Sequence, residues 1–224
     1  MPSAEQQIIF ENRRDAGRQL AAQLGEYQGQ SVVLAIPNGG VPVAIEVAIV
    51  LKADFDVVIT RKIPMPLNPE AGFGAVADDG TITIDNETVA RIGLNPQQID
   101  YQVSKVRADI LQRSLRYHGD RPLTIVTGKA VIIIDDGLAS GLTMRAAVES
   151  VRRRRPKEIV VAAPVAEASA QAQLEKVADR VVTCFTVSTT GFAIADFYRY
   201  WRDVSDDEVI QYIAEWRGRR FRGG

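Results

Sequence analysis

The chain has very little of two residue types that build many functional sites. Its 224 residues include one cysteine, Cys184, and one histidine, His118. A single cysteine excludes an internal disulfide and is typical of a protein from the reducing cytoplasm. A single histidine excludes a metal site built from several histidines. Because His118 precedes a Gly-Asp-Arg-Pro segment, the sequence indicates a solvated residue at a helix end.

Neither sign of charge is in excess, and long apolar runs are also missing. The chain carries 27 basic and 28 acidic side chains, so no long-range field attracts nucleic acid or an anionic membrane. No apolar stretch approaches the about 20 residues that cross a bilayer, and the N-terminus lacks the pattern of a secretion signal. We therefore expect a cytoplasmic protein without a membrane or nucleic-acid partner. Because the net charge is near zero, any anion site must be built from local groups. The sequence leaves undecided whether the protein forms a homodimer.

Short apolar runs alternate with helical patterns along most of the chain. The apolar runs predict strands at residues 31–36, 54–62, 130–134, 158–163 and 180–185. The helical patterns between and around them lie at residues 5–26, 41–51, 141–155, 167–178 and 205–217. This alternation predicts an α/β fold with a parallel five-stranded core sheet and helices on both faces. Right-handed crossovers favour the strand order 2-1-3-4-5, counted along the chain.

The segment between the second and third core strands breaks this alternation. Residues 63–74 hold three prolines and two glycines and predict a loop, either a mobile lid or a rigid brace. Residues 75–85 predict a hairpin, and residues 86–92 and 96–118 predict helices. We interpret residues 1–224 as a single domain with a small hood-like insertion at about 75–118.

The most informative segment is residues 131–144, Val-Ile-Ile-Ile-Asp-Asp-Gly-Leu-Ala-Ser-Gly-Leu-Thr-Met. A buried strand ends in Asp135 and Asp136, a turn of small residues follows, and a helix begins. Backbone N–H groups converge easily in such a turn, and the helix N-terminus favours an anion, so we expect a phosphate there. Two carboxylates beside a phosphate need donors or a cation, and a ribose diol with bound magnesium supplies both. A receiver-like magnesium pocket is the alternative, but it gives no reason for the small-residue turn.

This segment resembles the phosphoribosyl pyrophosphate signature of type I phosphoribosyltransferases. The resemblance implies that Asp135 and Asp136 bind the ribose hydroxyls and hold Mg²⁺ through water or ligand hydroxyls. It implies a 5-phosphate site at Gly137, Ala139, Ser140, Gly141, Leu142 and Thr143. Further segments, Arg61-Lys62-Ile63, Asn68-Pro69-Glu70 and Gly74-Ala75-Val76, look like a group of bacterial predicted phosphoribosyltransferases of unknown acceptor.

Two further segments agree with a pyrophosphate site. The turn after the first core strand resembles a pyrophosphate loop, and its residues are Pro37, Asn38, Gly39 and Gly40. Glycines there permit close backbone approach or an unusual peptide geometry. Arg61 and Lys62 end the second predicted strand and could neutralise a departing pyrophosphate. Ligands in open α/β sheets bind at the carboxyl ends of the strands where the order reverses, which here lies between the first and third core strands.

The acceptor base is less well indicated. The hypoxanthine-guanine branch of the family has an aspartate where this chain has Ala139, whereas adenine-type enzymes have alanine there. The chain after the fifth core strand is the expected base pocket, with Phe192 stacking and Asp196 accepting. We expect a magnesium-dependent enzyme of nucleotide metabolism, with Asp135, Asp136, Arg61 and Lys62 as the catalytic set. The alternative is a non-catalytic regulator that binds phosphoribosyl pyrophosphate or a nucleotide.

Overall fold

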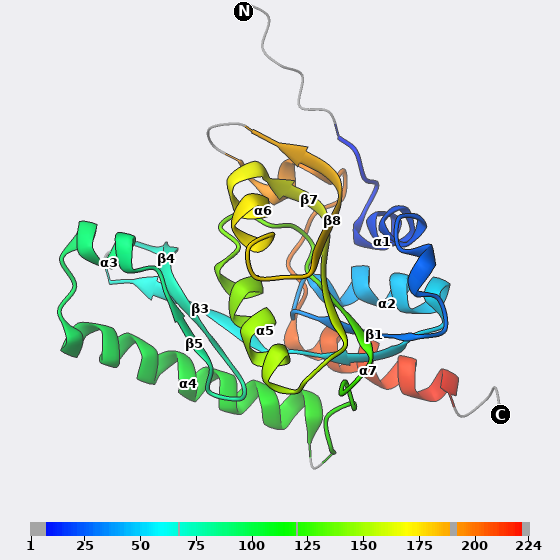
Figure 1. The fold of residues 1–224 in the computed structure, drawn as a ribbon, viewed down its shortest axis with the longest axis horizontal. Helices are drawn as coiled ribbons and strands as arrows, with labels where there is room; N and C mark the ends of the chain where they lie inside the picture. Colours follow the sequence, from blue (N-terminus) through cyan, green and yellow to red (C-terminus); the bar gives the residue numbers. More distant parts are fainter. Residues whose placement is uncertain (1–7, 67, 120, 189–191, 221–224) are drawn as a thin grey trace, which may run out of the picture.

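The computed structural model describes residues 8–66, 68–119, 121–188 and 192–220. Within these residues the chain forms a five-stranded parallel sheet, a three-stranded antiparallel sheet and seven α-helices (Figure 1). The parallel sheet has the order β2-β1-β6-β7-β8, which confirms the predicted order. Its strands are β1 (Ser31–Ala35), β2 (Asp54–Val57), β6 (Ala130–Ile134), β7 (Glu158–Glu167) and β8 (Arg180–Val187).

Helices cover both faces of the parallel sheet, as expected for continuously apolar strands. Along β6, Ile132 and Ile134 pack against one layer, and Val131 and Ile133 pack against the other, because successive side chains point to opposite faces. The first layer contains α1 (Arg13–Ala22), α2 (Gly40–Leu51) and α7 (Asp206–Arg220). The second contains α5 (Leu142–Arg153) and α6 (Ala168–Leu174). The predicted α/β class is therefore confirmed.

The antiparallel sheet stands beside this core. It consists of β3 (Thr60–Met65), β4 (Asn68–Ala77) and β5 (Ile82–Ile84), with β4 in the middle. Helices α3 (Asn86–Ile92) and α4 (Pro96–His118) follow it, as predicted. In Figure 1 these elements extend to the left of the core, and α4 runs back beneath it. The small sheet packs against α5, at the end of the core where β6 gives way to α5.

The predicted loop at residues 63–74 is wrong, and so is the single strand at 54–62. Strands β2 and β3 are separate, and β3 pairs with β4 in a long hairpin from Thr60↔Ala77 to Met65↔Asn68. Proline is tolerated because β3 is an edge strand and the register shifts on both sides of Pro64. A paired hairpin replaces the predicted loop, and the choice between a mobile lid and a rigid brace stays a prediction.

The first predicted helix is also too long. Helix α1 begins at Arg13, because the side chain of Asn12 caps it by accepting from the N–H groups of Arg14 and Asp15. Residues 8–12 precede the helix, and Phe10 instead forms an isolated β-bridge with Tyr198. Residues 5–7 of the prediction lie outside the described residues. Residues 9 and 10 are therefore held against the segment near residue 198.

The histidine is not solvated, contrary to the expectation for a helix end. Only 6% of His118 is exposed, because the end of α4 packs where the core meets the small sheet. Its ring nitrogens each lie 3.7 Å from a carboxylate, Nδ1 from Asp56 and Nε2 from Asp78. Cys184 is half-buried, and burial raises the pKa of its thiol to about 11, which fits a packing role. None of the helices in the described residues has the length and apolar character to cross a bilayer.

Candidate active site

Two loops meet where the strand order reverses, after β1 and after β6. The N–H of Ile36 donates to the carbonyl of Ile134 over 2.8 Å, and the Pro37–Asn38 peptide bond is cis. Added to Gly39, a Cβ atom would lie 1.9 Å from Oδ2 of Asp136. The close approach of the two loops therefore requires glycine at this position. The predicted pyrophosphate loop and the predicted acid pair are in direct contact.

Each carboxylate of the acid pair has one oxygen engaged by the protein. Oδ1 of Asp135 accepts from the N–H of Asp136 over 2.9 Å. Oδ2 of Asp136 accepts from Nε of Arg13 over 2.8 Å, and both of these side chains are buried. The backbone carbonyl of Asp136 also accepts from the hydroxyl of Tyr198 over 2.6 Å. This clamp fixes Asp136, while Asp135 lines the cavities described below.

The electrostatics of the pair follow from burial. Burial raises the pKa of Asp135 well above its usual range, and the neighbouring charge of Asp136 raises it further. Burial also raises the pKa of Asp136, although Arg13 acts in the opposite direction. Two adjacent, poorly solvated carboxylates are costly without a cation or donors opposite them. The pair therefore has the electrostatic character of a ligand site.

The turn after the acid pair is open to an anion. Gly141, at φ 71°, is the N-cap of α5 and offers no side-chain cap to the first turn of the helix, where the N–H of Leu142 makes a long contact of 3.5 Å with Oγ of Ser140. Leu138 ties the turn to β7, since its N–H donates to the carbonyl of Val165 over 2.9 Å. A cavity of about 200 Å³ opens here, and it is lined by Lys62, Asp135, Asp136, Gly137, Leu138, Ala139, Ser140, Gly141, Thr143 and Ile194.

A larger cavity of about 530 Å³ lies between the core and the small sheet with α4. Asp135, Lys62 and Thr143 line both cavities, which therefore adjoin. The remaining lining residues are Ile36, Pro37, Thr60, Arg61, Pro64, Pro69, Gln102, Lys105, Val106 and Asp109. The expected cations thus reach the site from β3 rather than from the end of a core strand. Nε of Arg61 is held by Oδ2 of Asp109 at 2.8 Å.

Asn38 turns its side chain toward distant segments of the chain. Its Nδ2 donates to the carbonyl of Val204 over 2.8 Å and to Oδ1 of Asp206 over 2.9 Å. Its Oδ1 accepts from Nη1 of Arg113 over 2.8 Å. Because both polar atoms of its side chain are engaged by the protein, Asn38 can contact a ligand only through its backbone.

The two residues expected at the base are both half-buried. Phe192 packs against Phe197, with ring centroids 5.4 Å apart, and Asp196 lies in the short 3₁₀ helix Ile194–Phe197. Neither is among the residues lining the two cavities, whereas Ile194 is. A Cβ on Gly137 would lie 2.7 Å from the Ile194 side chain, so this segment covers the acid pair closely. The base-binding role stays a prediction, and Thr189, Thr190 and Gly191 lie outside the described residues.

Sequence reasoning missed Arg13, the partner of Asp136. Its guanidinium lies 3.7 Å from the centre of the Trp201 ring, and its Nη1 donates to the carbonyl of Arg202 over 2.7 Å. A signal was present, because Arg13 shares the apolar face of α1 with Ala16 and Leu20. A basic residue on a buried helix face requires a buried acidic partner.

Comparisons with known proteins agree with this geometry. A family model described as "Phosphoribosyl transferase domain" matches residues 6–198. Two Mycobacterium tuberculosis proteins, MT0597 and Rv0571c, each named "Putative phosphoribosyl transferase", are 36% identical over 206 residues, or 92% of this chain and 46% of each relative. The chain therefore spans about half the length of these curated relatives.

Solved structures show the same fold. TT1426 from Thermus thermophilus is 34% identical and superposes with a TM-score of 0.77, covering 93% of this chain and 99% of that one. The AQ2163 protein from Aquifex aeolicus shares 11% identity at a TM-score of 0.50, over 78% of this chain and 74% of that one, and shows the fold alone. By its sequence and its fold, the chain belongs to the phosphoribosyl transferase domain family.

Proposed function

We propose that the chain is a phosphoribosyltransferase that transfers the 5-phosphoribosyl group of phosphoribosyl pyrophosphate to a nitrogenous base. Family membership supports the general reaction. The observation that carries the proposal is the sharing of Asp135, Lys62 and Thr143 by the two cavities. The acid pair, the small-residue turn and the cations therefore surround one adjoining space. This spatial order suits a sugar that carries a phosphate at one end and a pyrophosphate at the other. The turn would face the phosphate, the acid pair the sugar and the cations the pyrophosphate.

The smaller cavity is assigned to the ribose 5-phosphate. Backbone N–H groups from Ala139 to Thr143 would donate to the phosphate oxygens, with help from the hydroxyls of Ser140 and Thr143. The positive end of the α5 dipole adds to this attraction. Ala139 and Ser140 are exposed, so a phosphate can reach the turn from solvent.

The acid pair is assigned to the ribose hydroxyls. One oxygen of Asp135 and one of Asp136 are held by the protein, and the second oxygen of each would accept from a hydroxyl. Charge-assisted hydrogen bonds of this kind are strong and fix orientation. Arg13 keeps Asp136 from rotating, so the sugar meets a rigid surface.

The larger cavity is assigned to the pyrophosphate and the acceptor. Lys62 and Arg61 would neutralise the leaving group, and the backbone of residues 37–40 would contact it. We assign α4 and the small sheet the role of a hood over the acceptor, with Gln102, Lys105 and Val106 on its wall. A cavity of about 530 Å³ suits a small heterocycle.

The reaction is a substitution at C1 of the ribose. A ring nitrogen of the acceptor forms a bond to C1 with inversion, and the bond from C1 to the pyrophosphate oxygen breaks with its electron pair on that oxygen. The proton of the ring nitrogen passes to solvent or to the departing pyrophosphate. Positive charge develops on the sugar, and negative charge develops on the leaving group beside Lys62 and Arg61. The chain's main contribution is to hold sugar, acceptor and leaving group in line.

The residues present fit a magnesium ion that arrives with the substrate. No group of three or more histidine, cysteine, aspartate or glutamate side chains among the described residues forms a complete metal site. Magnesium commonly uses one or two carboxylates, water and substrate phosphates instead. Asp135 and Asp136 would hold it through water or ribose hydroxyls. When bound, the ion would supply positive charge to the pyrophosphate.

Pyrophosphate release tests this function. The protein would be incubated with magnesium and phosphoribosyl pyrophosphate against a panel of purine and pyrimidine bases. We expect release to depend on one class of base, with the matching nucleotide formed in equal amount. Tight binding of phosphoribosyl pyrophosphate without release for any base would contradict catalysis and favour the non-catalytic regulator.

A further inference from the structure

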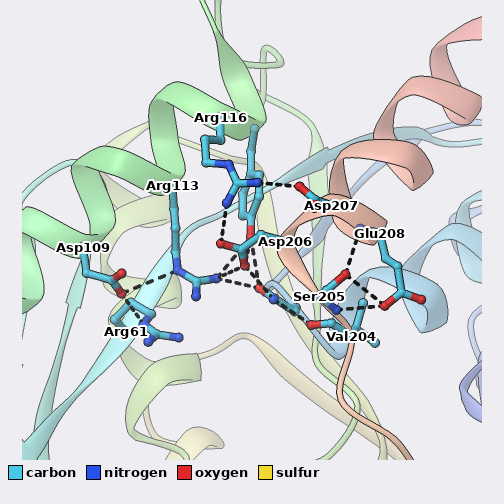
Figure 2. A network of polar contacts seen from close by, with 11 residues as sticks. Arg61, Asp109, Arg113, Arg116, Val204, Ser205, Asp206, Asp207 and Glu208 are labelled. Carbon is cyan, nitrogen blue, oxygen red and sulfur yellow. Dashed lines mark hydrogen bonds and ion pairs between the residues drawn. The ribbon is translucent and has the colours of Figure 1, made fainter.

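A network of polar contacts joins α4 and α7 beside the predicted pyrophosphate loop (Figure 2). Its centre is Asp206, the first residue of α7, whose side chain is 22% exposed. Oδ1 of Asp206 lies 2.7 Å from Nη1 of Arg113 and 2.7 Å from the hydroxyl of Tyr117. Its Oδ2 lies 3.0 Å from Nη1 of Arg116. One carboxylate therefore gathers three side chains of α4.

The same carboxylate holds Asn38. Oδ1 of Asp206 accepts from Nδ2 of Asn38 over 2.9 Å, and the carbonyl of Val204 accepts from the same group over 2.8 Å. On its other side the amide oxygen of Asn38 accepts from Arg113. These partners are 75 to 168 positions away in the sequence. The conformation of the loop is thus fixed by α4 and by the chain entering α7.

The protonation states of Asp206 and Tyr117 allow both side chains to make these contacts with Asn38 and Arg113. Burial by itself raises the pKa of Asp206, but hydrogen bonds from Asn38 and Tyr117 and the charges of Arg113 and Arg116 bring it below its usual value. Asp206 is therefore ionised at neutral pH. Burial and the contact with Asp206 raise the pKa of Tyr117, which keeps its hydroxyl as a donor.

The network also reaches Arg61, which is predicted to bind pyrophosphate. Oδ2 of Asp109 lies 3.5 Å from Nε of Arg113 and 2.8 Å from Nε of Arg61. Arg61 on β3 therefore adjoins the network that holds Asn38 in the loop after β1, because Asp109 pairs with both Arg61 and Arg113. Arg61 and Asn38 would face the same leaving group.

We propose that Asp206 is a positioning residue for the pyrophosphate loop, so that α7 serves the pyrophosphate end of the site without touching substrate. The inference rests on the proposed function. Backbone donors aimed at a highly charged ligand are effective only when they are held in place beforehand. Loss of the Asp206 charge releases Asn38 and lets the loop relax. The loss falls on pyrophosphate recognition and spares the ribose 5-phosphate half.

The test compares Asp206→Asn with the control Asp207→Asn. Asp207 lies in the same first turn of α7, but 82% of its side chain is exposed and it pairs with Arg116 over 2.6 Å. Both substitutions remove one negative charge from the helix start. Dissociation constants would be measured by calorimetry for magnesium pyrophosphate and, separately, for ribose 5-phosphate.

We expect Asp206→Asn to bind pyrophosphate about tenfold more weakly and ribose 5-phosphate as wild type does, as for a lost charge-assisted contact. Asp207→Asn should match wild type for both ligands, and Asp206→Glu should recover part of the loss. Tyr117→Phe removes one hydroxyl contact and should give a smaller loss of the same selectivity, even if Asp206→Asn folds poorly.

Three outcomes overturn the inference. If Asp206→Asn folds and binds pyrophosphate with wild-type affinity, this inference fails while the proposed function stands. If Asp206→Asn does not fold, wild-type pyrophosphate affinity in Tyr117→Phe has the same meaning. Equal weakening of both ligands assigns the network to general stability and overturns it too. Wild-type protein that binds neither ligand overturns both this inference and the proposed function.

Discussion

The two ends of the site are built in different ways. The proposed phosphate half, residues 135–143, is one continuous segment in which β6 ends, a turn follows and α5 begins. The proposed pyrophosphate half consists of residues 37–40 with Arg61 and Lys62, and its contacts come from α4 and α7. The comparison teaches that an anion site can be encoded locally by backbone geometry or assembled by long-range side-chain contacts. These two designs should respond differently to substitution.

The largest effect is expected from the buried ion pair of the proposed phosphate half, between Arg13 and Asp136. Arg13→Met leaves the buried Asp136 without its partner, and the free energy of unfolding should fall by about 3–5 kcal/mol. Arg14→Met is the matched control, because Arg14 is 45% exposed in its pair with Glu46 and should cost at most about 1 kcal/mol. Urea unfolding measures both.

The pH dependence sharpens this test. Burial raises the pKa of Asp136, and Arg13→Met removes the lowering influence of the guanidinium, so the folded variant binds protons more tightly than its unfolded chain. Stability lost at neutral pH should therefore return as the pH falls through the folded-state pKa. A loss that stays constant down to acid pH would contradict the buried ion pair.

Asp135→Asn should weaken ligand binding and at the same time raise the stability of the free protein. Affinity for magnesium phosphoribosyl pyrophosphate should fall by about ten- to a hundredfold, the usual value of hydrogen bonds to a charged group. Without ligand the variant should be more stable at neutral pH, because burial raises the pKa of Asp135 and its charge opposes folding. Each increase of 1 kcal/mol in the free energy of unfolding raises Tm by about 2–4 °C. Exposed Asp203→Asn, as control, should change neither quantity.

Gly141→Val tests the local design of the phosphate half. A branched residue at φ 71° costs about 1–2 kcal/mol and strains the turn, and its Cβ would lie 3.4 Å from the Leu174 side chain. Gly128→Val carries the same backbone penalty at φ 72°, with open space around it and no part in either cavity. We expect Gly141→Val to lose at least as much stability as Gly128→Val, because its side chain also meets Leu174, and we expect weaker ribose 5-phosphate binding in Gly141→Val alone. Equal binding in both variants would contradict the phosphate site.

The smallest effect is expected in the pyrophosphate half, where Asp109 competes for Arg61. Asp109→Asn should tighten pyrophosphate binding by about two- to fivefold, since an exposed ion pair is worth about 1 kcal/mol or less. Ribose 5-phosphate binding should not change. Asp100→Asn, a residue of the same helix outside both cavities, is the control. Weaker pyrophosphate binding in Asp109→Asn would show that Asp109 orients Arg61 more than it competes.

The sequence predicted the core fold and the strand, turn and helix of residues 131–144, because both depend on local patterns; phosphate binding by that turn stays a prediction. Apolar runs indicated the strands, and the run ending in Asp135-Asp136 was followed at once by its turn and helix. The hairpin of residues 60–77 was missed because proline argues against strands, and only the edge position and register shifts explain Pro64. His118 was misread because nothing in its neighbours reveals Asp56 and Asp78.

The pyrophosphate half could be predicted only in part. Residues 37–40, Arg61 and Lys62 were predicted to bind pyrophosphate, which stays a prediction. The supports of Asn38 lie in α4, at the start of α7 and just before it, and no local pattern connects them. The cytoplasmic location, the homodimer, the single-domain division and the base-binding role of Phe192 and Asp196 stay predictions. Such features depend on packing and partners, which local periodicity does not encode.

The most direct measurement is a crystal structure with magnesium and phosphoribosyl pyrophosphate bound. We expect the 5-phosphate within hydrogen-bonding distance of the backbone N–H groups from Ala139 to Thr143, and the pyrophosphate beside Lys62, with Asp135 on the ribose hydroxyls. A ligand bound with its 5-phosphate away from this turn, or with its pyrophosphate in the turn, would contradict the division of the site into these two halves.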